Sequence, residues 1–209
     1  MDRLAMTITA LHPSPDYVSD FIRASGHAYE YRVLDDLVQR LEKVTPGLII
    51  DVGAMIGNHS QFLAERLPEF GIAAFEPWPP SRELLCMNVG TYPNVRVYPY
   101  ALCDFTGHTF MRAEPGNIGH AYIGEAEGLP VKVRTLDSFR FSEVRLIKID
   151  VEGWEPTVLR GAWQTLNAWH PLVVMEDWTG GTYAGGLPQG YRLVADWERE
   201  HQMWLYGWE

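Results

Sequence analysis

One short segment places small and acidic residues where an apolar run ends. Residues 48–58 begin with Leu-Ile-Ile and then turn through Asp51, Gly53, Ala54, Gly57 and Asn58. This pattern is typical of a buried strand that turns tightly into a helix, with Asn58 at the N-cap and Gln61 completing a capping box. Glycine lets a backbone approach a ligand closely. The segment therefore predicts a ligand-binding turn, and the alternative is an ordinary strand–turn–helix.

Glu76 follows a second apolar run at residues 71–75. A carboxylate at this point can accept hydrogen bonds from both ribose hydroxyls of a nucleoside cofactor. The glycine spacing is G-x-x-x-G, which is not the dinucleotide fingerprint, and no P-loop lysine follows it. A phosphate-free adenosyl cofactor, S-adenosylmethionine, fits this pattern best. A nicotinamide oxidoreductase is disfavoured because the glycines that would hold its phosphates are missing.

A second group of acidic residues follows two later apolar runs. Asp150 and Glu152 come after residues 146–149, and Glu176 and Asp177 end the next run. Ligands bind at the carboxyl ends of strands in open α/β sheets. The four carboxylates have three interpretations: they bind a cofactor ammonium and deprotonate an acceptor hydroxyl, they hold Mg²⁺, or they are solvated strand ends.

Three further residues carry chemistry in their side chains. Lys148 lies inside an apolar run, where it is either catalytic or ion-paired; pairing is favoured because a buried unpaired ammonium is costly. His120, next to Gly119, is a candidate base or acceptor contact. Glu155 falls in a first helical turn, where the helix dipole favours a carboxylate.

These residues are positioned by an alternation of strands and helices. We predict strands at residues 48–52, 71–75, 95–99, 145–149 and 172–176, and helices at residues 58–67, 80–89 and 155–167. Such alternation indicates a doubly wound α/β fold with a mostly parallel sheet and right-handed crossovers. Residues 191–195 and 203–206 are predicted to close the sheet as an antiparallel hairpin.

The chain of 209 residues has the length of one domain. Two regions of it depart from the alternation of strands and helices. Turn signals between short β-like pieces predict a β insertion or flap at residues 104–135, with residues 131–134 as one strand. Residues 1–46 contain apolar positions at helical spacing. We expect two N-terminal helices there that cover the sheet edge or the cofactor mouth.

The composition is that of a globular protein, with 46% hydrophobic and 21% charged residues. A formal charge of −10 argues against a broad nucleic-acid surface and favours a small-molecule or glycan acceptor. No apolar run is long enough for a membrane span, and two cysteines without a framework favour a reducing cytoplasm. Eight tryptophans suit carbohydrate stacking, a core or a homo-oligomer surface equally well.

Several motifs together resemble the FkbM family of methyltransferases, from about residue 47 to the end of the chain. They are residues 51–57, Phe75-Glu76-Pro77, residues 100–104 with Gly107, Asn117 with Gly119, residues 134–137, and Lys148-Ile-Asp-Val-Glu-Gly153 with Glu155, Leu159 and Gly161. The resemblance implies a seven-stranded class I methyltransferase fold and O-methylation, commonly of sugar or polyketide hydroxyls. Met55 departs from the family, which usually has asparagine there.

The resemblance also implies roles for individual residues. The methionine part of S-adenosylmethionine would lie along residues 51–58, namely at Asp51, Gly53, Ala54, Gly57 and Asn58. Glu76 would hold the ribose, Ala101 and Leu102 would flank the adenine, and Pro77 would also belong to the cofactor site. Trp78 would pack near the adenine or in the core. The carboxylates of Asp150, Glu152, Glu176 and Asp177 also resemble the set of metal-dependent sugar O-methyltransferases of the macrocin type, which use aspartates at most of these positions.

The sequence thus predicts an S-adenosylmethionine-dependent O-methyltransferase that acts on a sugar, glycan or small natural product. Asp150 or Glu152 is the candidate base. The alternative is a non-catalytic module of the same fold that binds a nucleoside cofactor or a protein partner.

Overall fold

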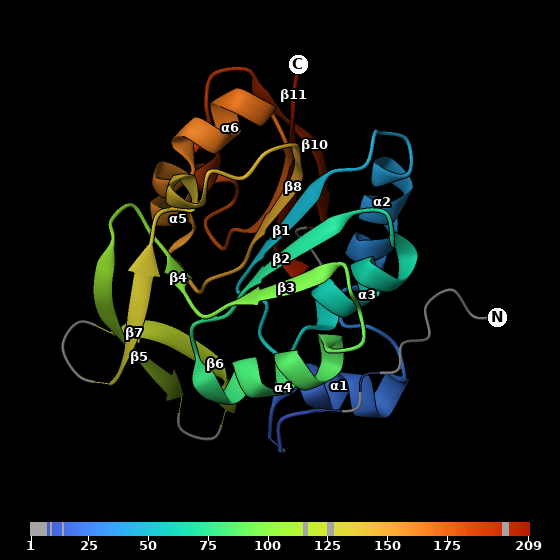
Figure 1. Ribbon diagram of the computed structural model, residues 1–209, viewed down its shortest axis with the longest axis vertical. Coiled ribbons are helices and arrows are strands. Elements are labelled where there is room, and N and C mark those ends of the chain that lie inside the picture. Colours follow the sequence, from blue (N-terminus) through green and yellow to red (C-terminus); the bar gives the residue numbers. More distant parts are fainter. Residues whose placement is uncertain (1–7, 9, 14, 115–116, 125–127, 198–200) are drawn as a thin grey trace.

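The structure is a computed structural model that describes residues 8, 10–13, 15–114, 117–124, 128–197 and 201–209. For residues 114 and 117–120 it describes the backbone alone. A mixed sheet forms the centre of the molecule (Figure 1). In spatial order its strands are β10 (Tyr191–Trp197), β11 (Met203–Trp208), β9 (Leu172–Glu176), β8 (Val144–Ile149), β1 (Leu48–Val52), β2 (Gly71–Phe75) and β3 (Val95–Tyr98).

The five strands from β9 to β3 are mutually parallel. At one edge, β11 runs antiparallel to both of its neighbours, β9 and β10. The predicted closing hairpin is therefore present, although both of its strands are longer than expected. The sheet is mixed and not purely parallel. Because β9, β8, β1 and β2 are parallel, their carboxyl ends meet at one edge of the sheet.

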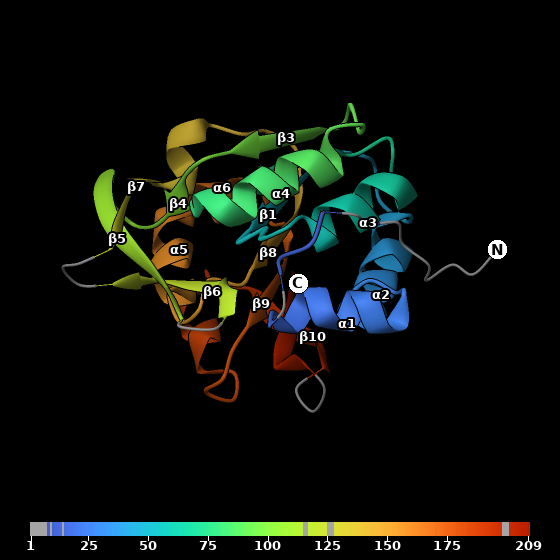
Figure 2. The ribbon, with the colours of Figure 1, turned by 90° about the horizontal axis from the view of Figure 1, so that it is seen from below.

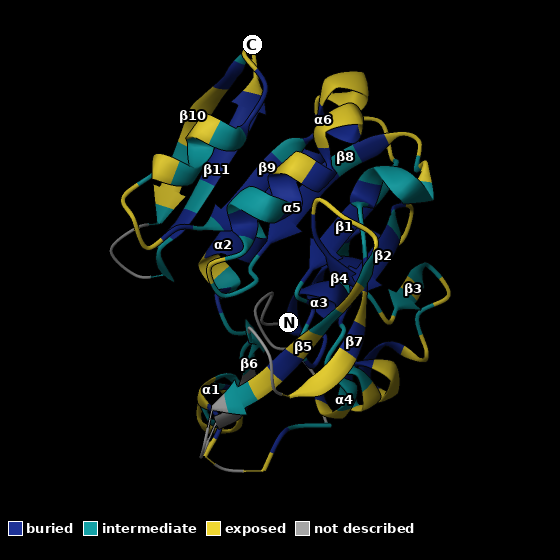
Figure 3. Ribbon diagram, turned by 90° about the vertical axis from the view of Figure 1, so that its left-hand side faces the viewer, coloured by how far each residue is buried: buried dark blue, intermediate teal, exposed yellow. Residues whose placement is uncertain are grey.

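Side chains alternate between the two faces of the sheet, and helices cover both. On one face, Ile49 and Leu146 belong to a core with helices α2 (Tyr31–Leu41) and α3 (Asn58–Arg66). On the other face, Ile50 and Ile147 pack with residues of helices α5 (Glu155–Gly161) and α6 (Trp163–Trp169). The central strands are dark blue in Figure 3 because both of their faces are buried.

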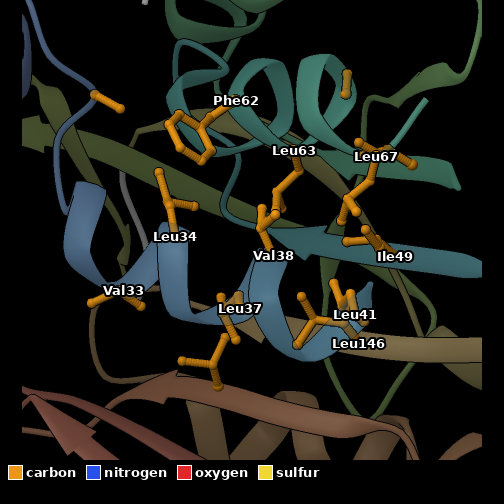
Figure 4. Packing of buried hydrophobic residues seen from close by; sticks show 14 of the residues in the cluster. Val33, Leu34, Leu37, Val38, Leu41, Ile49, Phe62, Leu63, Leu67 and Leu146 are labelled. Carbon is orange, nitrogen blue, oxygen red and sulfur yellow. The ribbon is translucent and has the colours of Figure 1, made fainter. Parts of the chain in front are cut away.

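Helix α2 is part of the main core and not a peripheral cover. Its apolar positions Leu34, Leu37 and Leu41 are at most 2% exposed, and they pack toward α3 and β1 (Figure 4). Helix α1 (Tyr17–Ser25) begins with Asp16, whose carboxylate accepts from the Ser19 N–H at 2.9 Å, and it lies against strand β6 (Asn117–Gly124). Helix α4 (Pro79–Val89) packs on Ala74 of β2 through Leu85 and Val89.

The insertion forms a second sheet of four strands, in the order β4 (Ala101–Leu102), β7 (Leu129–Arg134), β5 (Gly107–Glu114), β6. Strands β5 and β7 lie at the left of the molecule in Figure 2, away from α2, whereas β6 lies against α1. Met111, Val131 and Val133 form its small core with Ala101 and Cys103. The predicted strand at residues 131–134 lies within β7.

The single helix predicted at residues 155–167 is wrong, because α5 and α6 are separate helices. The backbone leaves the helical region at Ala162, whose φ is −109°. Asp137 of the 3-10 turn η1 (Leu136–Phe139) then caps α6 from a distance: its carboxylate accepts from the Gln164 and Thr165 N–H groups, each at 2.9 Å. A second 3-10 turn, η2 (Thr182–Gly186), follows β9.

Gly161 sets how closely α5 approaches the inserted sheet. A Cβ there would lie 1.9 Å from the Cys103 carbonyl oxygen. We predict that Gly161→Ala lowers the free energy of unfolding by about 1–3 kcal/mol, because backbone must move to make room. Urea denaturation measures this.

Gly185→Ala in η2 is the matched control, since a Cβ there meets nothing within 4 Å. It should leave the free energy of unfolding nearly unchanged. Equal effects of the two substitutions would contradict the packing explanation.

Candidate active site

A pocket of about 690 Å³, measured with the space at its mouth, opens at the carboxyl ends of β1, β2 and β8. The strand ends contribute Val52, Gly53, Phe75, Glu76, Asp150 and Glu152. The loop before β4 and β4 itself contribute Tyr100, Ala101 and Leu102, and Pro77 completes this side. Gly53, Glu76, Pro77, Ala101, Leu102, Asp150 and Glu152 had been predicted as site residues from sequence.

The far wall of the pocket comes from the inserted sheet and was not predicted. Met111 of β5 and Ala121, Tyr122 and Ile123 of β6 line it. The sequence of this insertion shows turn signals but no ligand-binding motif, so only the folded chain reveals its contribution.

The glycines of the first turn serve the protein's own packing. Gly53 has φ 79°, and a Cβ there would lie 1.9 Å from the Asp150 carbonyl oxygen, so glycine lets the β1 and β8 ends meet. Gly57 has φ 90°, and its Cβ would lie 2.7 Å from Leu85. Gly53 also borders the pocket, whereas Gly57 is not among the residues that line it.

Glu76 accepts backbone hydrogen bonds with both of its carboxylate oxygens. The Met55 N–H donates to Oε2 at 2.8 Å, and the Trp78 N–H donates to Oε1 at 2.7 Å. Burial raises the pKa of this carboxyl to about 7, although the two backbone hydrogen bonds act to lower it. Each oxygen keeps a second lone pair, which is what a pair of ribose hydroxyls requires. Met55 itself has φ 50°, a conformation that asparagine adopts more readily than methionine.

Asn58 has a different role from the predicted one. Gly57 occupies the N-cap position of α3 and no side chain caps this helix, so the predicted capping box is wrong. The Asn58 side chain instead bonds the backbone of Tyr29, accepting from its N–H and donating to its carbonyl, both at 3.0 Å. This pair of bonds ties the turn between α1 and α2 to the start of α3. Asn58, Ala54 and Trp78 are not among the pocket-lining residues.

Lys148 is ion-paired, as its position in an apolar strand predicted. The β1–β8 register sets it opposite Asp51, and its Nζ lies 3.5 Å from Asp51 Oδ1 and 3.2 Å from Asp150 Oδ2. Nζ also donates to the Gly53 carbonyl at 3.1 Å. Burial alone would lower the pKa of Lys148, but Asp150 and Asp51 raise it above its usual value. Asp51 is fully buried, accepts from the Ser60 hydroxyl at 2.6 Å, and does not line the pocket.

Glu155 shapes the loop that presents Asp150 and Glu152. Its Oε1 accepts from the Val151 N–H at 2.9 Å and the Gly153 N–H at 3.4 Å. This loop is tightly turned, since Glu152 and Gly153 have φ of 58° and 91°. Glu155 is thus more than a favourable charge at a helix start. Its side chain is 1% exposed, and burial raises its pKa.

The acidic residues after β9 do not act as one metal-ligating group. Asp177 Oδ1 accepts from the Thr179 N–H at 2.7 Å, and Oδ2 accepts from the Tyr183 N–H at 2.9 Å, so both oxygens hold the following loop. Glu176 differs from Asp177, because its Oε2 is buried and has no hydrogen-bond partner among the described residues. No cluster of three or more His, Cys, Asp or Glu within the described part of the chain is arranged to hold a metal ion. The predicted four-carboxylate Mg²⁺ site is therefore not supported.

The turn between α1 and α2 also reaches the site, which the sequence did not indicate. Glu30 is buried at a φ of 59°, and its Oε2 lies 3.0 Å from His59 Nε2. Burial and the charges of Glu30, Asp150 and Glu176 raise the pKa of Tyr29, which places its phenol in their field. The remaining candidate, His120, lies in β6, and its side chain is outside the described part of the structure.

Comparison with known proteins agrees with this geometry. Residues 51–202 match the family model described as the methyltransferase FkbM domain. The chain belongs to the FkbM methyltransferase family. Membership implies S-adenosylmethionine as the methyl donor. The matched residues include the end of β1 and its turn, Glu76, Asp150 and Glu176.

Solved structures support the class I methyltransferase fold. The FkbM methyltransferase from Methylobacillus flagellatus KT superposes with a TM-score of 0.56 at 16% identity, over 81% of this chain and 46% of that one. A putative caffeoyl-CoA O-methyltransferase from Staphylococcus aureus gives 0.57 at 13% identity, over 95% and 93%. At these identities the likeness concerns the fold alone.

One curated relative is much longer than this chain. The AMB antimetabolite synthetase AmbE from Pseudomonas aeruginosa is 37% identical over 107 residues, which are 50% of this chain but 5% of that protein. Across the described residues, no helix is both long and apolar enough to cross a membrane.

Removal of the Lys148 charge should destabilise the protein. We predict that Lys148→Met lowers the free energy of unfolding by about 3–5 kcal/mol at pH 7, because Asp51 and Asp150 lose their cation. Denaturant unfolding at pH 7 measures it.

Lys132→Met, an exposed position on β7, is the control and should change the free energy of unfolding by less than about 0.5 kcal/mol. A Lys148→Met protein as stable as wild type at pH 7 would rule out a structural role for this ion pair.

Proposed function

We propose that this chain is an S-adenosylmethionine-dependent O-methyltransferase whose acceptor is a hydroxyl of a sugar, a glycan or a small natural product. The observation that carries the proposal is that one pocket has two kinds of end. At one end is Glu76, which can accept hydrogen bonds from ribose hydroxyls, and at the other are the strand-end carboxylates of Asp150 and Glu152. The residues between them supply an apolar wall.

The cofactor half of the pocket has the chemistry that an adenosyl group needs. Glu76 would accept from the ribose hydroxyls, and Pro77, Ala101 and Leu102 would contact the adenine. Gly53 would lie along the methionine part. When bound, S-adenosylmethionine supplies an electrophilic methyl group on a sulfonium. The protein's part is to orient an acceptor oxygen in line with that methyl and to remove its proton.

Acidic surroundings at the other end favour a neutral or cationic acceptor over a phosphorylated one. Asp150, Glu152 and Glu176 stand there, and Lys148, the nearby cation, already faces Asp51 and Asp150. The formal charge of −10 points away from nucleic acid in the same way. The relation to part of an antimetabolite synthetase supports a small natural product as one acceptor class.

A non-catalytic binding module remains the alternative, and an acceptor screen separates the two. Wild-type protein is incubated with S-adenosylmethionine and a panel of methyl glycosides and hydroxylated amino acids, with and without Mg²⁺, and mass spectrometry follows the products. We expect a mass gain of one methyl group on an oxygen. Methylation on nitrogen or carbon alone, or no transfer while the cofactor binds, would refute the proposal.

Glu76 should make cofactor binding depend on pH. Its carboxyl, with a pKa of about 7 in the free protein, must be ionised to accept from two ribose hydroxyls. We predict that S-adenosylhomocysteine binds more weakly as the pH falls from 8 to 5.5 and that binding releases protons at pH 6. Calorimetry in two buffers of different ionisation enthalpy measures both effects.

Glu76→Gln should weaken binding at pH 8 by about 10- to 100-fold, since a hydrogen bond to a charged group contributes about 1.5–3 kcal/mol. The pH dependence should also disappear. Glu83→Gln, exposed on α4, is the matched control and should bind like wild type. Proton uptake on binding, or equal affinity at pH 5.5 and pH 8, would contradict this role.

A further inference from the structure

We propose that Glu176 is the general base that removes the proton of the acceptor hydroxyl, and that Trp178 is its positioning residue. The inference rests on the O-methyl transfer proposed above. It goes beyond the sequence, which favoured Asp150 or Glu152 as the base.

The sheet brings Glu176 to the reaction end of the pocket. Ile149 of β8 pairs with Met175 of β9, so the next residues, Asp150 and Glu176, lie side by side where the two strands end. Asp150 lines the pocket, and its charge raises the pKa of Glu176, which shows that the two carboxyls are close. Glu176 therefore stands next to the pocket at the edge that an acceptor must occupy.

Three other carboxylates near this edge, those of Asp150, Asp177 and Glu155, are already engaged or buried. Asp150 is engaged in an ion pair, because its Oδ2 lies 3.2 Å from the Lys148 Nζ. Asp177 is bound to its own loop, and Glu155 is 1% exposed. Glu176 is half-buried, faces no cation in a salt bridge among the described residues, and has an Oε2 without a hydrogen-bond partner.

Trp178 fixes the direction of the Glu176 carboxyl. Its side chain hydrogen-bonds to Glu176, and the indole N–H is its sole donor. The ring is otherwise 69% exposed, an unusual position for so large an apolar side chain. Asp177, between the two residues, keeps the loop in place through its backbone N–H, which donates to the Gln202 carbonyl at 2.9 Å. This contact restrains the Glu176 carboxyl, whose Oε2 has no hydrogen-bond partner among the described residues.

The charges around Glu176 suit a base. Burial raises its pKa to about 9; Asp150, Glu152 and Glu155 add to the rise, and the Trp178 hydrogen bond opposes it. Burial raises the pKa values of Tyr29 in the α1–α2 turn and of Tyr183 in η2, and the charge of Glu176 adds to both rises. A carboxylate with so high a pKa holds a proton more strongly than an ordinary one, so it is better matched to an alcohol.

The step balances with the residues and substrates at hand. The acceptor O–H bond breaks, and its proton passes to the Glu176 carboxylate. The acceptor oxygen forms a bond to the methyl carbon as the carbon–sulfur bond breaks, and that electron pair remains on sulfur. The products are the methyl ether, S-adenosylhomocysteine and a protonated Glu176, which returns its proton to solvent.

Two experiments test the assignment. In the first, protein labelled with ¹³C at the glutamate carboxyls is titrated by NMR, and Glu176→Gln identifies the Glu176 signal. We expect this signal to titrate near pH 9 and to move to higher pH in Trp178→Phe, which removes the hydrogen bond. Trp163→Phe, an exposed tryptophan on α6, is the matched control and should leave it unchanged. Titration in the ordinary range near 4.5 would overturn the proposal, whatever the acceptor.

In the second, the kinetics of the best hydroxyl acceptor from the screen are followed against pH. We expect Glu176→Gln to lower kcat by about 10²- to 10⁴-fold while S-adenosylhomocysteine binds as in wild type. The wild-type rate should rise with pH toward 9, and Trp178→Phe should displace this rise upward.

Full activity of Glu176→Gln, with Asp150→Asn or Glu152→Gln inactive, would overturn the role of Glu176 and leave O-methylation intact. Failure of the wild-type protein to methylate any hydroxyl, with transfer to nitrogen or carbon instead, would refute both proposals.

Discussion

The buried ammonium of Lys148 is the interaction on which the rest of the site depends. It lies between Asp51 and Asp150 and donates to the Gly53 carbonyl, so one cation joins β1, β8 and the turns that follow both strands. Without it, two carboxylates would lie uncompensated between the sheet and the α2–α3 layer, which costs several kcal/mol. With it, Gly53 and Asp150 are brought together at one end of the pocket. The ion pair therefore permits an acidic site to be built on strands that are otherwise apolar.

The N-terminal segment adds a second constraint. Asn58 holds the Tyr29 backbone from both sides, and Glu30 meets His59 in the interior. These contacts connect residues before position 51 to the region that matches the family, residues 51–202. The α1–α2 turn thus becomes part of the site although it lies outside the shared domain.

The pocket divides its chemistry along its length. At one end, the inserted sheet supplies Met111 and Ile123 and the loop after β2 supplies Pro77, an apolar surface beside the single carboxyl of Glu76. At the other end, carboxyls crowd together and raise one another's pKa values, as Glu176 and Glu155 show. These raised pKa values lower the free energy of unfolding near neutral pH, because the folded protein then binds protons that the unfolded chain does not. Sites that keep such a cost are commonly functional.

The sequence by itself determined the elements and the ends at which chemistry occurs. Continuous apolar runs alternating with helical segments predicted the parallel strands, and a carboxylate directly after such a strand, as at Glu76 and Asp150, must lie at the ligand-binding edge. The sequence did not determine which neighbour each polar group would meet. Asn58 bonds Tyr29 rather than capping α3, Asp177 turns to Tyr183 rather than to a metal, and helix 155–167 is divided where Gly161 meets Cys103. The strand signals are local, because alternation follows from the geometry of the strand itself. The partners of Asn58, of Glu176 and of the inserted wall are separated from them along the chain and have no local pattern, so the packing of the whole sheet decided them.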